Sequence, residues 1–285
     1  MIELDQETSN ALNQGMEMGG GIMLPFIAPT LWALNGKAEL RQIGGAQYFG
    51  GWAANRDDIE DALQQNKLDW LPGSMKRETF VVKGDKEIEV YTSRGVLVAP
   101  IGLQKAWLTD DGRRLPAYTE GVRARQHAQA LVLLAGKDKE GIIHPWGPAV
   151  LSAKGYQATN LLDAFGAWDK HTKSIRRQIA PNVPAWCFYL AIGTFGNERK
   201  GVMVGKNGAQ SSITPIGPYL PETITPETME ALFVGRETAS EMAVYLSDAR
   251  EWLDAWKVEH KDTLGQPQDG GPDPVEPNYD NEVPF

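Results

Sequence analysis

The sequence has one cysteine, Cys187, and this scarcity excludes an internal disulfide and a cysteine-clustered metal site. It also lacks any run of about 18 consecutive apolar residues, so we expect no transmembrane helix. The first five residues, Met1 to Asp5, are acidic and lack the basic start and apolar stretch of a secretory signal. These absences together favour a soluble, cytoplasmic protein with no membrane partner.

Catalytic motifs are equally scarce. The four histidines never stand four residues apart or beside glutamate in a metalloprotease pattern. Glu198-Arg199-Lys200 has the Glu-x-Lys spacing of many metal-dependent nucleases, in which the acid holds the metal and the lysine steadies the attacking water. That spacing also recurs by chance, and here it lies in an expected hairpin turn. We therefore predict a protein that is not an enzyme, with no cofactor and no metal site.

The net charge of −9 argues against a nucleic-acid partner at first sight, because phosphate binding requires lysine and arginine. The charge is uneven, however. Residues 263–285 contain five acids and no base, so without them the net charge would be −4. Overall charge therefore neither supports nor excludes DNA binding.

Residues 263–285 are dominated by proline, glycine, glutamine and acids. Apolar side chains are too sparse there to offset the entropy lost when the backbone is ordered. We expect a disordered acidic tail after one domain formed by residues 1–262. The last residue, Phe285, is a bulky aromatic and is unusual for a segment that only adds solubility.

The body has the patterns of an α+β, mainly β protein. Strand patterns cover residues 87–100, 122–135, 141–151, 185–195 and 201–213, and helical patterns cover 56–66, 160–179 and 225–256. Thr225 is a good N-cap before Pro226, and Gly235 is a point where the last region can divide. The order of three strands, a helix and two strands predicts an OB-fold-like Greek-key barrel with extra helices. Residues 1–80 could not be placed.

Single-stranded DNA is bound by cations that follow the backbone and by aromatic rings on which bases stack. Nine tryptophans are present, and several aromatic residues lie near basic ones in the expected barrel. Arg123 and Arg125 alternate on one face of a predicted strand, and His127 follows them as a possible phosphate contact. Tyr48-Phe49-Gly-Gly-Trp52 offers further aromatics that look exposed. The predicted DNA contacts are Lys105, Trp107, Arg113, Arg114, Tyr118, Arg123, Arg125, Lys173, Arg176 and Arg177.

The end of the chain resembles that of bacterial single-stranded-DNA-binding proteins. These proteins combine an OB domain, a flexible Gly/Pro/Gln-rich linker and an acidic tip ending in Pro-Phe. Here the linker begins at Gly265-Gln-Pro-Gln-Asp-Gly-Gly-Pro, and the tip is Asp280-Asn281-Glu282-Val283-Pro284-Phe285. Asn281 interrupts the acids, and Val283 replaces the family's isoleucine. The resemblance covers about 23 residues; in its plan, the body is similar to larger phage or mobile-element proteins of this kind.

The resemblance implies that Asp280, Glu282, Val283, Pro284 and Phe285 recruit replication, recombination or repair proteins. We therefore expect a protein that coats and protects single-stranded DNA in a bacterial or phage-infected cell, and that can form homo-oligomers. The acidic tail would compete with DNA for the cationic groove. Three alternatives stay open: a strand-annealing recombination protein, a nuclease that uses Glu198, and an adaptor that carries the tip and never touches DNA.

Overall fold

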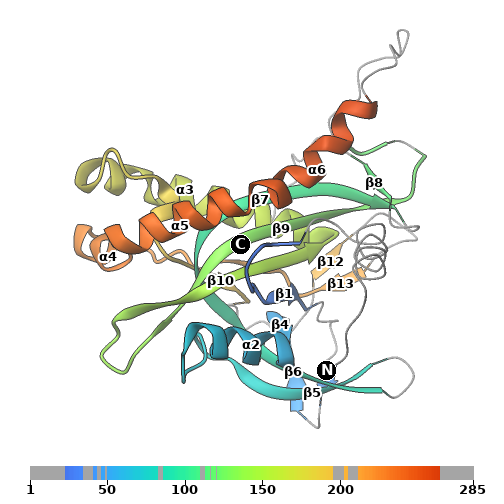
Figure 1. Ribbon diagram of the computed structural model, residues 1–285, viewed down its shortest axis with the longest axis horizontal. Helices are drawn as coiled ribbons and strands as arrows, with labels where there is room; N and C mark the ends of the chain where they lie inside the picture. Colours follow the sequence, from blue (N-terminus) through green and yellow to red (C-terminus); the bar gives the residue numbers. More distant parts are fainter. Residues whose placement is uncertain are drawn as a thin grey trace, which may run out of the picture.

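The computed structural model of the chain describes residues 23–34, 41–43, 46–48, 50–82, 86–109, 113–115, 117–119, 121–194, 202–204 and 211–263. It is a mixed α+β structure with a strongly curled sheet that forms a half-barrel (Figure 1). Nine strands follow each other in the order β14-β11-β7-β9-β10-β1-β4-β6-β5, and β8 pairs with β7. The strands are β1 Thr30–Ala33, β4 Trp52–Asn55, β5 Lys76–Val82, β6 Lys86–Ser93, β7 Gly95–Thr109, β8 Arg114–Leu115, β9 Ala124–Lys137, β10 Ile143–Lys154, β11 Leu190–Gly193 and β14 Gly217–Pro218.

Two short strand pairs lie outside this sheet. They are β2 (Arg41–Ile43) with β3 (Ala46–Tyr48), and β12 (Val202–Val204) with β13 (Ser211–Ile213). The helices are α2 Arg56–Asn66, α3 Tyr156–Ile179, the short 3-10 helix η1 Ala185–Cys187, α4 Pro226–Ala231, α5 Arg236–Asp248 and α6 Arg250–Thr263. No helix in the described part of the chain is both long and apolar enough to cross a membrane.

The three longest strands, β7, β9 and β10, form the centre of the sheet. β9 pairs antiparallel with both neighbours, and β1 adds to β10 in parallel. Residues 130–135 of β9 form a continuous apolar run in which every residue is buried. A strand needs such a run, rather than alternation, when both of its faces are covered. The centre of the sheet is therefore packed on both sides.

Different helices cover the two faces (Figure 1). Ala128, Ala130, Val132 and Leu134 of β9 pack in the main core with residues of α2 and α3, including the fully buried Trp168. The alternate residues Leu131 and Leu133 pack under α6 and α5 respectively. We call these the α3 face and the α6 face of the sheet.

Predictions based on local signals are confirmed. The helix expected over residues 56–66 is α2, and the helix expected over 160–179 is α3, which begins four residues earlier. Thr225 caps α4: its Oγ1 accepts a hydrogen bond from the Thr228 backbone N–H at 3.2 Å. Gly235, with φ of +87°, divides α4 from α5. Its left-handed conformation favours glycine.

Predictions that depended on strand pairing are partly wrong. The single strand expected over 87–100 is two strands, β6 and β7, which turn at Arg94, and β7 continues to Thr109. The strand expected over 185–195 begins as the helix η1, so β11 is only four residues long. The region 201–213 contains two strands that pair with each other. Apart from the helix expected over 56–66, the sequence left residues 1–80 unplaced; they supply β1, β4 and most of β5 of the main sheet.

Candidate nucleic-acid interface

One end of the central strands carries most of the predicted DNA contacts. β11 pairs with β7 only from Gly95 to Val98, and beyond it β7 and β9 continue together and are joined by β8. We call residues 103–109, 113–115 and 123–127 the ribbon end; it lies around β8 at the right of Figure 1. Because side chains of a strand alternate between faces, the ribbon end presents one set of residues on each face.

The α3 face of the ribbon end carries aromatic rings beside a cation. The exposed Lys105 and the half-buried Trp107 point to this face, and Trp107 lies opposite Gln126 in the register. The Tyr118 ring packs edge-on against Trp107 with 5.2 Å between ring centroids, and Tyr118 remains 61% exposed. The pair therefore offers accessible ring surface in a fixed geometry. We call it the aromatic pair.

The start of α3 adjoins the aromatic pair. The Gln126 carbonyl accepts a hydrogen bond from the Gly155 N–H at 2.6 Å, and the Thr159 hydroxyl donates to Gln126 Oε1 at 2.8 Å. Tyr156, the first residue of α3, is 51% exposed. Sequence reasoning missed Tyr156, because only the contact between α3 and β9 places the start of α3 beside Gln126.

The α6 face of the ribbon end carries cations around a histidine. Arg114 and Arg125 lie opposite Leu108 in the register, and His127 lies opposite Lys154. Burial, together with the smaller effects of the charges of Lys154 and Arg114, lowers the pKa of His127 to about 4. The imidazole is therefore neutral near pH 7, and its Nε2 pairs with the Ser152 hydroxyl at 3.0 Å.

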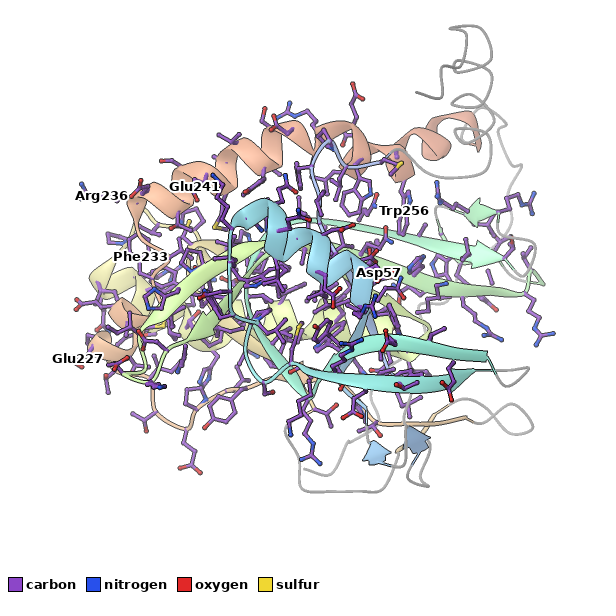
Figure 2. All side chains as sticks on the ribbon, turned by 60° about the horizontal axis from the view of Figure 1, so that its bottom comes forward. Asp57, Glu227, Phe233, Arg236, Glu241 and Trp256 are labelled. Atoms are coloured by element: carbon purple, nitrogen blue, oxygen red, sulfur yellow. The ribbon has the colours of Figure 1, made fainter. Side chains whose placement is uncertain are left out.

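Helix α6 covers this face with Trp256. The Arg114 guanidinium lies 5.3 Å from the centre of the Trp256 ring, within the range of a cation–π contact. The His127 ring lies 5.2 Å from the same ring. Figure 2 shows Trp256 on the side of α6 that faces the strands. Neither Lys154 nor Trp256 was among the predicted contacts, and nothing local in the sequence marks them.

The predicted DNA contacts thus divide into two groups. Those at or beside the ribbon end are Lys105, Trp107, Arg113, Arg114, Tyr118, Arg123 and Arg125. Lys173, Arg176 and Arg177 lie in the last two turns of α3. Fourteen residues separate Thr159 from Lys173, which is about 21 Å along a helix. The two groups are not one cluster.

Two individual predictions are corrected, and a third residue, Arg176, is found to have local partners. Trp52 is fully buried and its Nε1–H donates to the Ile192 carbonyl at 3.0 Å, so it offers no ring to a base. Arg123 precedes β9 and does not alternate with Arg125 along it. Arg176 is engaged by the Asp169 carboxylate and by the Thr172 hydroxyl, which lies 3.0 Å from its Nε.

Other predictions fall on residues outside the described part of the chain. These are Glu198-Arg199-Lys200 and the docking residues Asp280, Glu282, Val283, Pro284 and Phe285. Within the described ranges, no three His, Cys, Asp or Glu side chains gather in a way that could hold a metal ion. Comparison with protein-family models, with curated proteins and with solved structures found no match.

Proposed function

We propose that this protein binds single-stranded DNA at the ribbon end. The observation that carries the proposal is the exposed Tyr118 ring on Trp107, with Lys105 exposed on the same face and Arg113 exposed beside it. Base stacking on aromatic side chains supplies about 1–3 kcal/mol per base, and nearby cations neutralise phosphates. The arrangement favours a single strand, because the bases of a duplex are already stacked on one another.

The proposed role is to coat and protect single strands during DNA replication, recombination or repair. The curled sheet around α3 is compatible with the OB-like barrel expected from the sequence, which stays a prediction. The resemblance of the C-terminal tip to that of bacterial single-stranded-DNA-binding proteins supports the recruitment of partner proteins through Asp280 to Phe285.

The position of α6 supports competition between the tail and DNA. α6 contacts the ribbon end through Trp256 and ends at Thr263, directly before the acidic segment. Trp256 and Thr263 are seven residues apart in the helix, which is about 10 Å along its axis. The five acids of the tail are therefore tethered close to the cations that we assign to phosphates, and they would compete with DNA when no partner holds the tip.

A binding comparison tests the proposal. The affinities of a fluorescein-labelled dT30 and of a duplex of equal length are measured by anisotropy for the parent and for Trp107→Ala with Tyr118→Ala. Loss of one stacked base corresponds to about 5- to 100-fold weaker dT30 binding. Tyr219→Ala is the matched control, because Tyr219 is 56% exposed beside β14. Failure of the parent to bind dT30, or equal weakening by the control, would contradict the proposal.

A second candidate function, strand annealing, is favoured by one observation: the ribbon end has cations on both faces, Lys105 on one and Arg114 and Arg125 on the other. Such a ribbon can neutralise two strands at once. Faster pairing of complementary oligonucleotides at equal coverage would distinguish annealing from coating.

A further inference from the structure

A row of polar side chains crosses the α6 face of the sheet beneath α6. We call it the polar row; it consists of Gln104 on β7, His127 and Gln129 on β9, and Ser152 on β10. The Gln104 Nε2–H donates to Gln129 Oε1 at 2.9 Å, and His127 pairs with Ser152 at 3.0 Å. On this face the polar row lies between the cations of the ribbon end and the apolar Leu131 and Val150.

The polar row is incompletely satisfied. Gln104 is 5% exposed, and its Oε1 is buried with no hydrogen-bond partner among the described residues. If both glutamine amides were turned over, the Gln104 amide nitrogen would take the unpaired position that Oε1 has now. One polar group of Gln104 therefore stays unpaired in either orientation. A buried polar group without a partner destabilises the folded state, whereas two apolar side chains in place of Gln104 and Gln129 would carry no such cost.

Helix α6 covers the polar row, but none of its described side chains donates a hydrogen bond to Gln104 Oε1. Its inner side presents Trp252, Leu253 and Trp256. Leu253 packs against Gly102, where a Cβ atom would lie 2.7 Å from the leucine Cδ1. The Trp256 ring lies over Arg114 and is tilted by 47° to the His127 ring, so it occupies the space beside an imidazole and a guanidinium, two groups on which nucleobases stack.

The polar row also has an open side. A groove of about 630 Å³ lies along residues 23–28, and its wall includes Gln129, Val150 and Trp252. Exposed Arg125 and Lys154 stand on the same face of the sheet, beyond His127. A strand entering at this groove would find hydrogen-bonding groups for base edges and cations for phosphates.

We propose that the polar row is a base-binding part of the DNA site, and that α6 is a removable cover that occupies it when no strand is bound. This inference depends on the proposed function, and it assigns single-stranded nucleobases to Gln104, His127 and Gln129. Because α6 leads directly into the acidic tail, removal of the cover would also carry the tail away from the ribbon end.

A reversible lock tests the cover. Gly102→Cys and Leu253→Cys, made in a Cys187→Ser background, place two thiols where the Leu253 side chain now packs against the Gly102 backbone. Oxidised glutathione would join them and hold α6 on the sheet, and dithiothreitol would release it. We expect the oxidised protein to bind dT30 at least tenfold more weakly than the reduced protein. Equal affinities with the disulfide verified by mass spectrometry would overturn the inference.

A second variant does not depend on the disulfide. Gln104→Leu with Gln129→Leu removes the polar groups and leaves an apolar interface under α6. A purely structural role predicts an unchanged or higher thermal midpoint together with unchanged DNA binding. The inference instead predicts that dT30 affinity falls about tenfold while the midpoint is maintained or rises. Unchanged affinity would again overturn it.

These outcomes are separable from failure of the proposed function. If the parent and the reduced protein bind no dT30, the proposed function itself is wrong. If the parent binds dT30 and Trp107→Ala weakens that binding, but neither the disulfide lock nor the glutamine variant weakens it, the proposed function stands. Only the inference that α6 covers a base-binding polar row is then wrong.

Discussion

The salt dependence of DNA binding gives a quantitative test of the ribbon end. Each phosphate neutralised on a single strand contributes about −0.7 to the slope of log affinity against log salt concentration. The cations at the ribbon end are Lys105, Arg113, Arg114, Arg123 and Arg125, and Lys154 lies beside it, opposite His127. If each one contacts a phosphate, the slope is about −4, and affinity falls roughly 300-fold between 50 and 200 mM salt.

The perturbation is Lys105→Ala combined with Arg125→Ala. The two side chains are exposed on opposite faces of the ribbon end, so their removal should change the free energy of unfolding by less than about 0.5 kcal/mol each. Loss of two contacts reduces the slope to about −3 and the fall in affinity over the same salt range to roughly 50-fold. The assay is dT30 anisotropy at four salt concentrations.

The matched control is Lys173→Ala with Arg177→Ala, which removes two exposed cations from the far end of α3. For this control variant we expect the same slope of log affinity against log salt concentration as for the parent. The reasoning fails if the ribbon-end variant keeps the parent's slope, or if the control lowers it by the same amount, because the strand would then follow α3.

Three further predictions concern the tail, acid stability and packing. Deletion of residues 264–285 should tighten dT30 binding at low salt and change it little at high salt, where the acids are screened. Equal affinity of the parent and the deletion variant at low salt would contradict competition between the tail and DNA. Because His127 has a folded pKa of about 4 and an unfolded value near 6.5, the unfolded state binds the proton first, so stability should fall as the pH drops from about 6.5 to 4. The difference between the folded and unfolded pKa of His127 corresponds to roughly 3 kcal/mol of unfolding free energy, and partial exposure of the ring reduces this to about half. The urea midpoints of the parent and of His127→Gln should therefore diverge as the pH falls from about 6.5 to 4. Parallel pH dependence of the two midpoints would contradict the lowered pKa of His127. Gly136→Ala should cost about 1–3 kcal/mol in thermal unfolding, because its Cβ would lie 2.4 Å from Trp70 Cζ3, whereas Gly166→Ala, with no atom near its Cβ in α3, should stabilise by about 0.5–1 kcal/mol.

The parts of this fold that could be predicted from the sequence are those set by neighbouring residues. Helix α2 was expected with the bounds that it has, and the Thr225-Pro226 cap and the Gly235 break both follow from residues within a few positions. The strand expected over residues 122–135 is similarly present, as β9. Each signal acts within one turn or one strand.

The remaining features depend on contacts between distant residues. The sequence around Arg94 does not show that β6 and β7 pair with different neighbours. Trp52 seemed exposed beside two glycines, but β4 places it against Ile192, 140 residues away. Likewise, the contact of Arg114 with the Trp256 ring and that of Thr159 with Gln126 depend on the packing of α6 and α3 on the central strands. Strand register and helix packing, which no local pattern encodes, decide these contacts.

The central claim is that this chain binds single strands through the ribbon end, and tryptophan fluorescence tests it most directly. Trp107 is half-buried there, while Trp52, Trp146 and Trp168 lie buried in the core. Titration with a long oligo-dT should therefore give saturable quenching that is weak with duplex, reversed by salt and reduced in Trp107→Phe. No quenching and no binding at low salt, even after residues 264–285 are removed, would contradict the account and favour an adaptor that never touches DNA.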